Sequence, residues 1–277
     1  MGKTYENWLV VSDIDGTLNS KARTLPKRNL DAITEFVNAG GNFTLASGRL
    51  VTSLGKAYGT VPCNAPAVIL NGAGIYDYNK NKLLVKNEIN EDGRALVKSL
   101  MKKYPLAEVG IFFEDFVYIV RAGILSLGQI AFDKSNYKIC SLDEVPKNGW
   151  CKVIFWSNPV VVKAMEKYVD ANNSFGMTFM ETSIWSYEML AGGIHKGTGV
   201  MQLAEKLGID KSHVAAIGDY YNDYDMLKSV GLPACAGQAP KDIHKICKLV
   251  ACHCNQGCVA DLIEYIMALE ESEECNV

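Results

Sequence analysis

No apolar stretch of this 277-residue chain reaches the roughly 18 residues that a membrane-spanning helix requires. Long runs of one charge are also missing, because 28 basic and 31 acidic residues are interspersed and leave a net charge of −3. Proteins that bind nucleic acid or anionic membranes usually carry a basic patch, so neither partner is predicted. The first apolar run begins within about ten residues of Met1, which leaves no room for a secretory leader. We therefore expect a cytoplasmic protein that acts on a small molecule.

The cysteines do not form a disulfide framework. The chain has nine, an odd number, and most are scattered and flanked by apolar residues, which argues against structural disulfides in this compartment. Cys252, Cys254 and Cys258 lie close together in ACHCNQGC, but their spacing departs from the ligand pairs of common zinc sites. The favoured interpretation is a loop with buried thiols, and the sequence assigns no role to these three residues.

Short apolar strands alternate with helices at the start of the chain, and 48% of all residues are hydrophobic, enough for a sizeable core. Residues 8–11 begin a predicted buried strand, and residues 26–41 form a predicted amphipathic helix that ends at two glycines. NFTLASGR and PAVILNGAG predict two further strands. This alternation is typical of an α/β fold with a doubly wound, Rossmann-like parallel sheet, in which ligands bind at the carboxyl ends of the strands.

The pattern changes near residue 80, where aromatic and β-branched strand candidates such as IFFEDFVYIV and CKVIFWS begin to alternate with helical stretches. This change of pattern indicates a second unit, of the α+β class. The first pattern resumes with KGTGVMQLAEKLGI, a predicted helix, and HVAAIGD, a predicted strand. The sequence therefore predicts a discontinuous core domain, residues 1–81 and 191–277, with a domain inserted at residues 82–190.

Polar residues follow the predicted strands of the core domain. Asp13 and Asp15 follow the first strand, Ser47 ends the second and Asn71 ends the third. A predicted helix begins at Lys196, and GDYYND adds Asp219, Asn222 and Asp223. Because parallel strands present their carboxyl ends at one edge, we expect these groups to form a single site. Its excess of carboxylates calls for a divalent cation, and all-oxygen ligands favour Mg²⁺.

A metal held by carboxylates beside a lysine, a hydroxyl and turn N–H groups is suited to cleaving a phosphate ester. DIDGTL, the serine after FTLA, the isolated Lys196 and GDYYND match, in order and spacing, the four motifs of the haloacid dehalogenase (HAD) superfamily. The chain resembles the phosphatases of that superfamily over nearly its whole length. Its insertion resembles the large α/β cap of the Cof-type branch, many of whose members hydrolyse sugar phosphates. The resemblance implies a magnesium-dependent phosphatase for a small phosphorylated metabolite, with a sugar phosphate as the expected substrate.

The resemblance also implies a role for each site residue. Asp13 is the expected nucleophile and a magnesium ligand, and Asp219 is a further ligand. Asp15 is expected to ligate magnesium through its backbone carbonyl, while its carboxyl group acts first as acid and then as base. The expected phosphate-binding groups are Ser47, Lys196, Asn222 and the backbone N–H groups of Ile14 and Gly48, with Asp223 and Asn71 in support.

Two other functions stay open at this point. A phosphomutase of the same superfamily also needs an acid two residues after the nucleophile, and it returns the phosphoryl group to a sugar. A non-enzymatic, phosphate-responsive regulatory domain would need neither Asp15 nor a cap. The chain also departs from the family pattern at Gly237-Gln238-Ala239, where relatives usually have GNA, and at CNQGCVADLI, where an acidic loop is common. Both departures lie near the expected leaving group, so they bear on the substrate rather than on the reaction.

Overall fold

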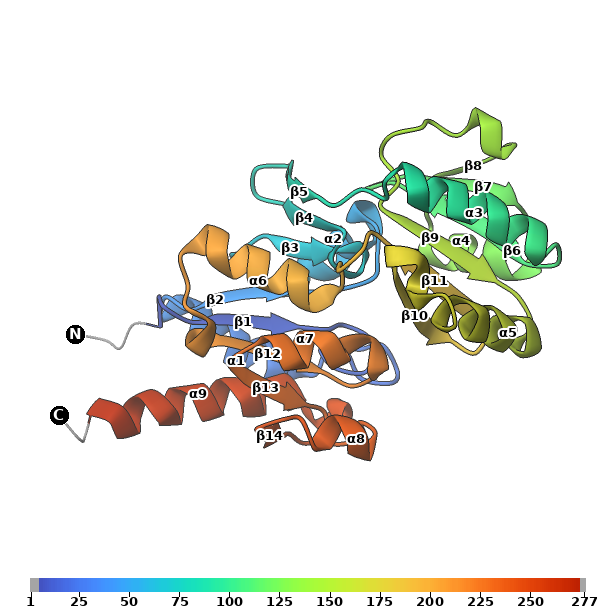
Figure 1. Cartoon of the computed structure of the whole chain (residues 1–277). Coiled ribbons are helices and arrows are strands. Elements are labelled where there is room, and N and C mark those ends of the chain that lie inside the picture. The colour runs from blue at the N-terminus through green and yellow to red at the C-terminus, as the bar shows by residue number, and fades with distance from the viewer. Residues whose placement is uncertain (1–4, 275–277) are drawn as a thin grey trace.

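The computed structural model describes residues 5–274, and its central element is a parallel sheet of five strands in the order β14–β13–β12–β1–β2 (Figure 1). Its strands are β1 (Leu9–Ser12), β2 (Asn42–Leu45), β12 (Val214–Gly218), β13 (Leu232–Cys235) and β14 (Leu249–Val250). Ser12 at the end of β1 is in register with Ile217 of β12 and Leu45 of β2. The segments that follow these strands therefore start at one edge of the sheet.

Helices cover both faces of this sheet. They are α1 (Lys27–Asn38), α2 (Val51–Tyr58), α6 (Lys196–Leu207), α7 (Tyr224–Ser229), α8 (Lys241–His244) and α9 (Cys258–Glu274). Val10 packs in the same hydrophobic cluster as α1 and α9, whereas Leu9 and Val11 pack with α6 and α7. Successive residues of a strand face opposite sides, so a strand covered on both faces is apolar throughout. The predicted doubly wound α/β fold is confirmed, and we call this sheet with its helices the core.

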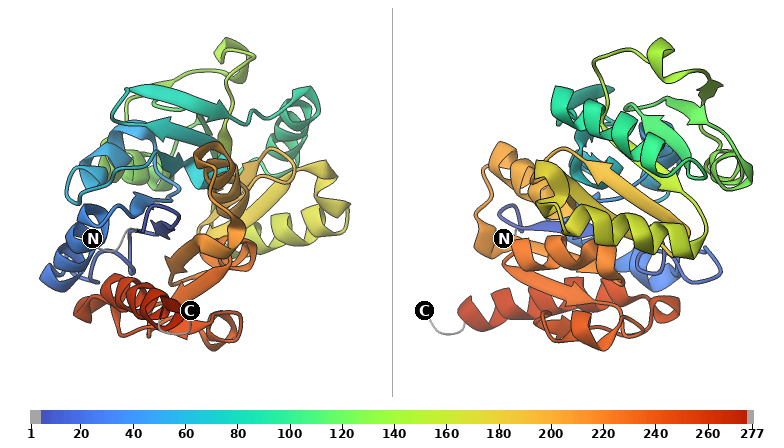
Figure 2. Two further views of the ribbon diagram at one scale, coloured as in Figure 1. Left: turned by 90° about the vertical axis from the view of Figure 1, so that its left-hand side faces the viewer. Right: turned by 45° about the vertical axis from the view of Figure 1, so that its right-hand side comes forward.

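A second sheet has six strands in the order β10–β11–β9–β6–β7–β8, and all neighbouring pairs except β7 with β8 are antiparallel. Its strands are β6 (Glu108–Phe112), β7 (Val117–Arg121), β8 (Tyr137–Ile139), β9 (Lys152–Trp156), β10 (Thr178–Ser183) and β11 (Ser186–Leu190). Helices α3 (Glu91–Lys103) and α5 (Pro159–Asp170) pack on one face, and α4 (Ile124–Asp133) packs with residues of the other. We call this part, residues 91–190, the inserted unit; it packs on the core at the end towards which β1 points (Figures 1 and 2).

A third, antiparallel sheet lies between the two units along the chain and comprises β3 (Ala67–Ile69), β4 (Gly74–Asp77) and β5 (Lys82–Lys86). A single bridge between Ala46 and Val68 connects β3 to the strand region of the core. The predicted inserted domain begins at residue 82, but residues 82–86 pair with β4 through a turn and not with the six-stranded sheet. The other domain boundaries stay a prediction. Within residues 5–274, none of the helices combines the length and the apolar character needed to span a bilayer.

Candidate active site

A cavity of about 480 Å³ lies where the carboxyl ends of the core strands meet the inserted unit. Most of the predicted site residues line it: Asp13, Asp15, Ser47, Gly48, Asn71, Asp219 and Asn222. The other three predicted residues are not part of its lining. Lys196 and Asp223 lie directly behind Asp13, and the Ile14 side chain is buried in the hydrophobic core. The structure thus brings segments from both ends of the chain to one edge of the sheet.

Lys196, the first residue of α6, is 1% exposed and bridges two carboxylates. Its Nζ lies 2.6 Å from Oδ1 of Asp13 and 2.6 Å from Oδ1 of Asp223. A cation at a helix N-terminus opposes the helix dipole, so it needs anions close by, and these two aspartates supply them. Burial alone would lower the pKa of Lys196, but the neighbouring Asp13 and Asp223 raise it above its ordinary value. The ammonium group therefore stays charged.

One lysine does not balance the acidic groups around it. Carboxylate oxygens of Asp13, Asp219 and Asp223 all lie within 4.8 Å of one another. Burial, and then the charge of Asp223, raises the pKa of Asp13 to about 7 and that of Asp219 to about 6. Each shift shows that a negative charge here lacks compensation. The donor set consists of oxygen atoms alone, which fits a hard divalent cation such as Mg²⁺.

The turn after Asp15 fits closely around Asp219. Gly16 has a left-handed backbone (φ 85°), and a Cβ atom at this position would lie 2.4 Å from Oδ2 of Asp219. The Gly16 carbonyl accepts a hydrogen bond of 2.6 Å from Nε2 of Gln238, and Oε1 of Gln238 accepts one of 3.0 Å from the Cys254 N–H. Gln238 belongs to the turn that departs from the family pattern, and it joins that turn to the loop of Cys254 and to the first motif.

Asp15 points away from the buried cluster. Its side chain is about half exposed, and Nη2 of Arg49 donates to its Oδ2 at 2.5 Å. The sequence analysis missed Arg49, although a basic residue two positions after Ser47, at the end of a predicted strand, was a usable signal. Arg49 places a guanidinium at the mouth of the cavity, next to the carboxyl group with the expected acid–base role.

Two loops of the core are held by charged residues of the inserted unit. Nζ of Lys152 donates to the Gly48 carbonyl at 3.0 Å, and Nδ2 of Asn71 donates to Oε2 of Glu188 at 2.8 Å. Lys152 and Glu188 are themselves 3.2 Å apart and almost fully buried. The sequence analysis missed both, although single charged residues inside the apolar segments CKVIFWS and SYEML were a signal. The inserted unit therefore contributes directly to the site.

The side chains of the cysteine-rich loop do not form a cluster with metal-ligand spacing among the described residues. Between residues 5 and 274 the only cluster of three or more His, Cys, Asp or Glu side chains with ligand spacing is that of Asp13, Asp219 and Asp223. Cys254 and Cys258 are buried, and the Cys258 thiol donates to the Thr17 carbonyl at 3.3 Å. Burial raises the pKa of Cys252 to about 11 and raises that of Cys258 as well, so both thiols stay protonated near neutral pH. The interpretation as a loop with buried thiols agrees with these contacts.

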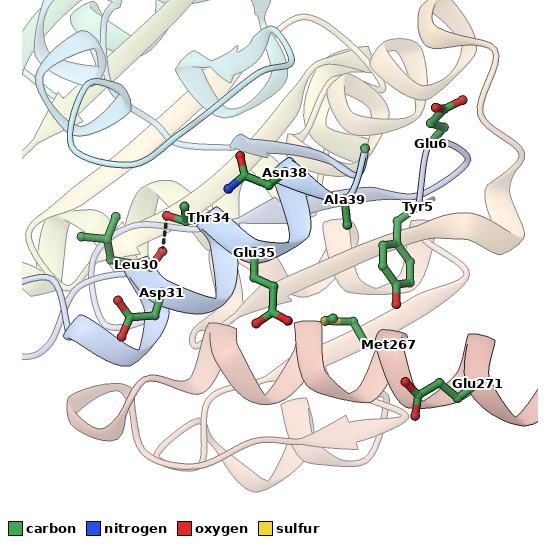
Figure 3. Close-up of a pocket in the computed structure, with 11 residues that line it drawn as sticks. Tyr5, Glu6, Leu30, Asp31, Thr34, Glu35, Asn38, Ala39, Met267 and Glu271 are labelled. Carbon is green, nitrogen blue, oxygen red and sulfur yellow. Dashed lines mark hydrogen bonds between the residues drawn. The ribbon is translucent and has the colours of Figure 1, made fainter. Parts of the chain in front are cut away.

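A wider groove of about 1090 Å³ lies between α1 and α9, at the end of the sheet where β1 and β2 begin (Figure 3). Its lining contains four carboxylates and no lysine or arginine: Glu6, Asp31, Glu35 and Glu271. These carboxylates would repel a phosphate group. The groove also lies at the start of the strands, whereas the clustered aspartates lie at their carboxyl ends. The smaller cavity at the strand ends is therefore the candidate active site.

This chain is similar to known proteins over most of its length. A family model described as haloacid dehalogenase-like hydrolase matches residues 10–263. The HMP-PP phosphatase of Klebsiella pneumoniae is 25% identical over 83% of this chain and 84% of its own length. The 5-amino-6-(5-phospho-D-ribitylamino)uracil phosphatase of Escherichia coli is 22% identical over 95% and 97%.

Solved structures show the same fold. A haloacid dehalogenase-like hydrolase from Bacteroides thetaiotaomicron superposes with a TM-score of 0.81 at 19% identity, covering 94% of this chain and 99% of the other. A HAD subclass IIB sugar phosphatase superposes with a TM-score of 0.78 at 16% identity, covering 94% and 98%. At these identities the likeness establishes the architecture of core and inserted unit.

Proposed function

This chain belongs to the haloacid dehalogenase-like hydrolase family and is a phosphatase of that family, and we propose that its substrate is a small phosphate monoester. In this proposal hydrolysis requires Mg²⁺, and Asp13 carries the phosphoryl group transiently. The observation that carries the proposal is the group of Lys196, Asp13 and Asp223, which are buried, with the half-buried Asp219. The lysine pairs with the proposed nucleophile, and the neighbouring carboxylates lack a compensating positive charge. Such a site can bind a metal ion and a phosphate group together.

Asp13, Asp219 and the backbone carbonyl of Asp15 are the proposed magnesium ligands. Asp223 supports them, because its Oδ1 binds Lys196 and its Oδ2 accepts a hydrogen bond of 3.0 Å from the Asp219 N–H. When bound, the ion supplies positive charge opposite the phosphoryl oxygens. Ser47 and the N–H groups of Ile14 and Gly48 are the proposed hydrogen-bond donors to those oxygens.

The chemistry then needs two residues of the first motif. In the first step a carboxylate oxygen of Asp13 forms a bond to phosphorus, the ester P–O bond breaks, and the carboxyl group of Asp15 gives its proton to the leaving oxygen. In the second step the Asp15 carboxylate takes a proton from water, the water oxygen forms a bond to phosphorus, and the bond between phosphorus and the Asp13 oxygen breaks. Inorganic phosphate leaves, and both aspartates return to their starting state.

The inserted unit is the proposed cap, which excludes water and binds the leaving group. It lines the cavity with the polar side chains of Gln129, Asp133, Lys152, Thr182 and Glu188. Such a lining suits a leaving group rich in hydroxyl groups, which supports a sugar phosphate as substrate. The relatives from Klebsiella pneumoniae and Escherichia coli are phosphatases, which favours a phosphatase over the phosphomutase alternative.

A substrate screen tests the proposal. Purified protein with Mg²⁺ is incubated with a panel of sugar phosphates, nucleotides and phosphorylated cofactors, and phosphate release is measured. We expect release from a subset of the panel, its loss in excess chelator, its return with Mg²⁺ and its absence in Asp13→Asn. Full activity in chelator would contradict the metal assignment, and a phosphoryl group that moves to another position of the sugar without phosphate release would identify a mutase.

A further inference from the structure

A second cavity of about 390 Å³ lies beside the candidate active site. The two cavities share a wall made of Asp15, Arg49, Phe132 and Asp133. The second cavity lies between the core, which contributes α2 and the loop after the first motif, and the C-terminal end of α4 in the inserted unit. The second cavity is therefore adjacent to the space in which a substrate bound at Asp13 would lie.

The second cavity carries excess positive charge. Its lining contains four basic residues and two acidic ones, and one of those acids, Asp15, is already paired with Arg49. The other three cations are Arg23, Lys56 and Lys134, and none of them forms an ion pair with a carboxylate of the described residues. Burial raises the pKa of Asp133, the second acidic residue, above its ordinary value. Three exposed cations that line one cavity and form no ion pair with the described residues, in a chain of net charge −3, point to an anionic ligand.

Arg23 is held at this cavity by its surroundings. Its N–H donates to the Ser20 carbonyl at 2.8 Å, in a turn that gives Arg23 a left-handed backbone (φ 60°). The guanidinium carbon lies 4.2 Å from the centre of the Phe132 ring. This cation–π contact joins Arg23 of the core to Phe132 of the inserted unit. Within residues 5–274 the guanidinium of Arg23 donates no hydrogen bond, so its N–H groups stay available for a planar or tetrahedral anion.

We propose that Arg23, Lys56 and Lys134 bind a second anionic group of the substrate, so that the preferred substrates are phosphate monoesters whose leaving group carries a phosphate or a carboxylate. This inference rests on the proposed function, because it assumes that the first phosphate lies at Asp13. It also gives the contact between α4 and the core a specific role, since closing the inserted unit would complete the second anion site together with the first.

Three hexose derivatives test the proposal with matched leaving groups. Glucose 6-phosphate offers no second anion, 6-phosphogluconate offers a carboxylate, and glucose 1,6-bisphosphate offers a phosphate. We expect kcat/KM for at least one charged ester to exceed that for glucose 6-phosphate by about tenfold or more, as one additional charge-assisted hydrogen bond implies. Which of the two charged esters is favoured distinguishes a carboxylate from a phosphate site. A wild-type enzyme that prefers glucose 6-phosphate would overturn the proposal.

The variant Arg23→Gln/Lys56→Gln/Lys134→Gln removes the three charges while keeping polar side chains. We expect it to lose the preference for the charged ester and to hydrolyse 4-nitrophenyl phosphate, which has no second anion, at close to the wild-type rate. The control Lys82→Gln/Lys98→Gln/Lys102→Gln removes the same net charge from exposed positions outside both cavities and should keep the preference. A triple variant with an unchanged preference would contradict the proposal.

A binding measurement separates this inference from the proposed function. Calorimetry with Asp13→Asn in Mg²⁺ compares glucose 1,6-bisphosphate with glucose 6-phosphate, without turnover. Tighter binding of the bisphosphate that disappears when the three charges are also removed would support the second site even if no ester of the series were hydrolysed. Equal binding of the two ligands would exclude it, whatever the activity of the enzyme.

Discussion

Nζ of Lys152 lies 3.2 Å from Oε2 of Glu188, and each of the two residues is also bound to a different loop of the core. They stand on neighbouring strands, on a sheet face where Ile154 and Leu190 are apolar and buried. A buried ion pair is costly unless its remaining donors and acceptors are satisfied. The Gly48 carbonyl and the Asn71 amide satisfy them here, so the pair is complete only when the inserted unit contacts both loops.

Exchanging the two charges tests whether this pair positions the two core loops or only stabilises the sheet of the inserted unit. Lys152→Glu/Glu188→Lys restores one cation beside one anion, but it places a carboxylate against the Gly48 carbonyl and an ammonium against the Asn71 amide. We expect the exchanged protein to bind inorganic phosphate about tenfold or more weakly than wild type, because the new carboxylate repels the Gly48 carbonyl and Asn71 must turn its amide to accept from the new ammonium. The inhibition constant of phosphate measures this effect, and thermal unfolding monitors the fold.

The variant Lys152→Met/Glu188→Gln is the companion to this exchange. It removes both charges, keeps an acceptor for the Asn71 amide and suits the apolar surroundings, so it should fold even if the exchanged protein does not. We expect it to bind phosphate more tightly than the exchanged protein and more weakly than wild type. If all three proteins bind phosphate equally, the pair stabilises the sheet alone and does not position the loops.

The raised pKa values predict how pH affects the metal-free protein. Asp13, at about 7, and Asp219, at about 6, stay protonated in the folded protein at pH values where an unfolded aspartate, with an ordinary pKa of 3.8, is already ionised. Their contribution to stability is therefore complete below about pH 4 and is lost as the pH rises through 6 and 7. Mg²⁺ should reverse this loss, because it favours the ionised carboxylates. We expect its affinity to rise with pH up to about 7.

Urea unfolding between about pH 4 and 8, with and without Mg²⁺, measures the first effect, and calorimetric titration measures the second. Since other groups titrate over the same range, the difference between wild type and Asp13→Asn isolates the contribution of Asp13. The variant should lose less stability than wild type as the pH rises. A pH dependence identical to that of wild type would show that Asp13 is ionised throughout.

The sequence predicted the parts of this site that follow from local order along the chain. Asp13 and Asp219 come directly after an apolar strand and Ser47 lies two residues after one, and a parallel sheet places such positions at one edge. Lys196 was predictable because a cation at a helix start needs an anion nearby. These positions depend on the strand order of the core, which short apolar segments and helix boundaries largely specify.

The parts that could not be predicted depend on contacts between units. Lys152 and Glu188 reach the core because of the register between β9 and β11 and because of the way the inserted sheet packs on the core. The alternation of residues within one strand predicts neither the register nor the packing. Arg49 became significant only through its distance from Asp15. The composition change near residue 80 predicts that the insertion begins with β5. Composition carries no information about which strands pair, so it does not reveal the pairing of β5 with β4.

The close fit between Gly16 and Asp219 gives a test of the metal site that leaves its ligands in place. In Gly16→Ala the new methyl group would lie within 2.4 Å of Oδ2 of Asp219 and must displace that carboxylate. Gly208→Ala is the matched control, because Gly208 also has a left-handed backbone (φ 71°) but nothing lies within 4 Å of its Cβ position. Both variants should lose about 1–2 kcal/mol of stability from the backbone strain. Only Gly16→Ala should weaken Mg²⁺ binding, as measured by calorimetry, and equal Mg²⁺ affinities would show that Asp219 does not hold the metal.

The different roles assigned to Asp13 and Asp15 predict different losses for their amide variants. Asp13→Asn removes the nucleophile, so it should abolish hydrolysis of every ester. Asp15→Asn keeps the backbone carbonyl and loses only the proton transfer, a contribution of typically ~10²–10⁴ in rate. The loss should depend on the leaving group. 4-Nitrophenyl phosphate expels a stabilised phenolate that needs little protonation, whereas a sugar phosphate expels a poor alkoxide that needs a proton in the transition state.

We therefore expect Asp15→Asn to lose much more rate on the sugar ester than on the nitrophenyl ester in the first turnover. Because Asp15 also takes a proton from the attacking water, the nitrophenyl reaction should show a burst of phenolate as the phosphoryl group accumulates on Asp13, followed by slow turnover. Rapid mixing with both substrates separates the two steps. Arg49→Gln provides the control, since it removes the cation that holds the Asp15 carboxylate but leaves the carboxyl group itself, and it should show no burst. An equal loss on both esters in the first turnover would show that the proton of the leaving group comes from elsewhere than Asp15.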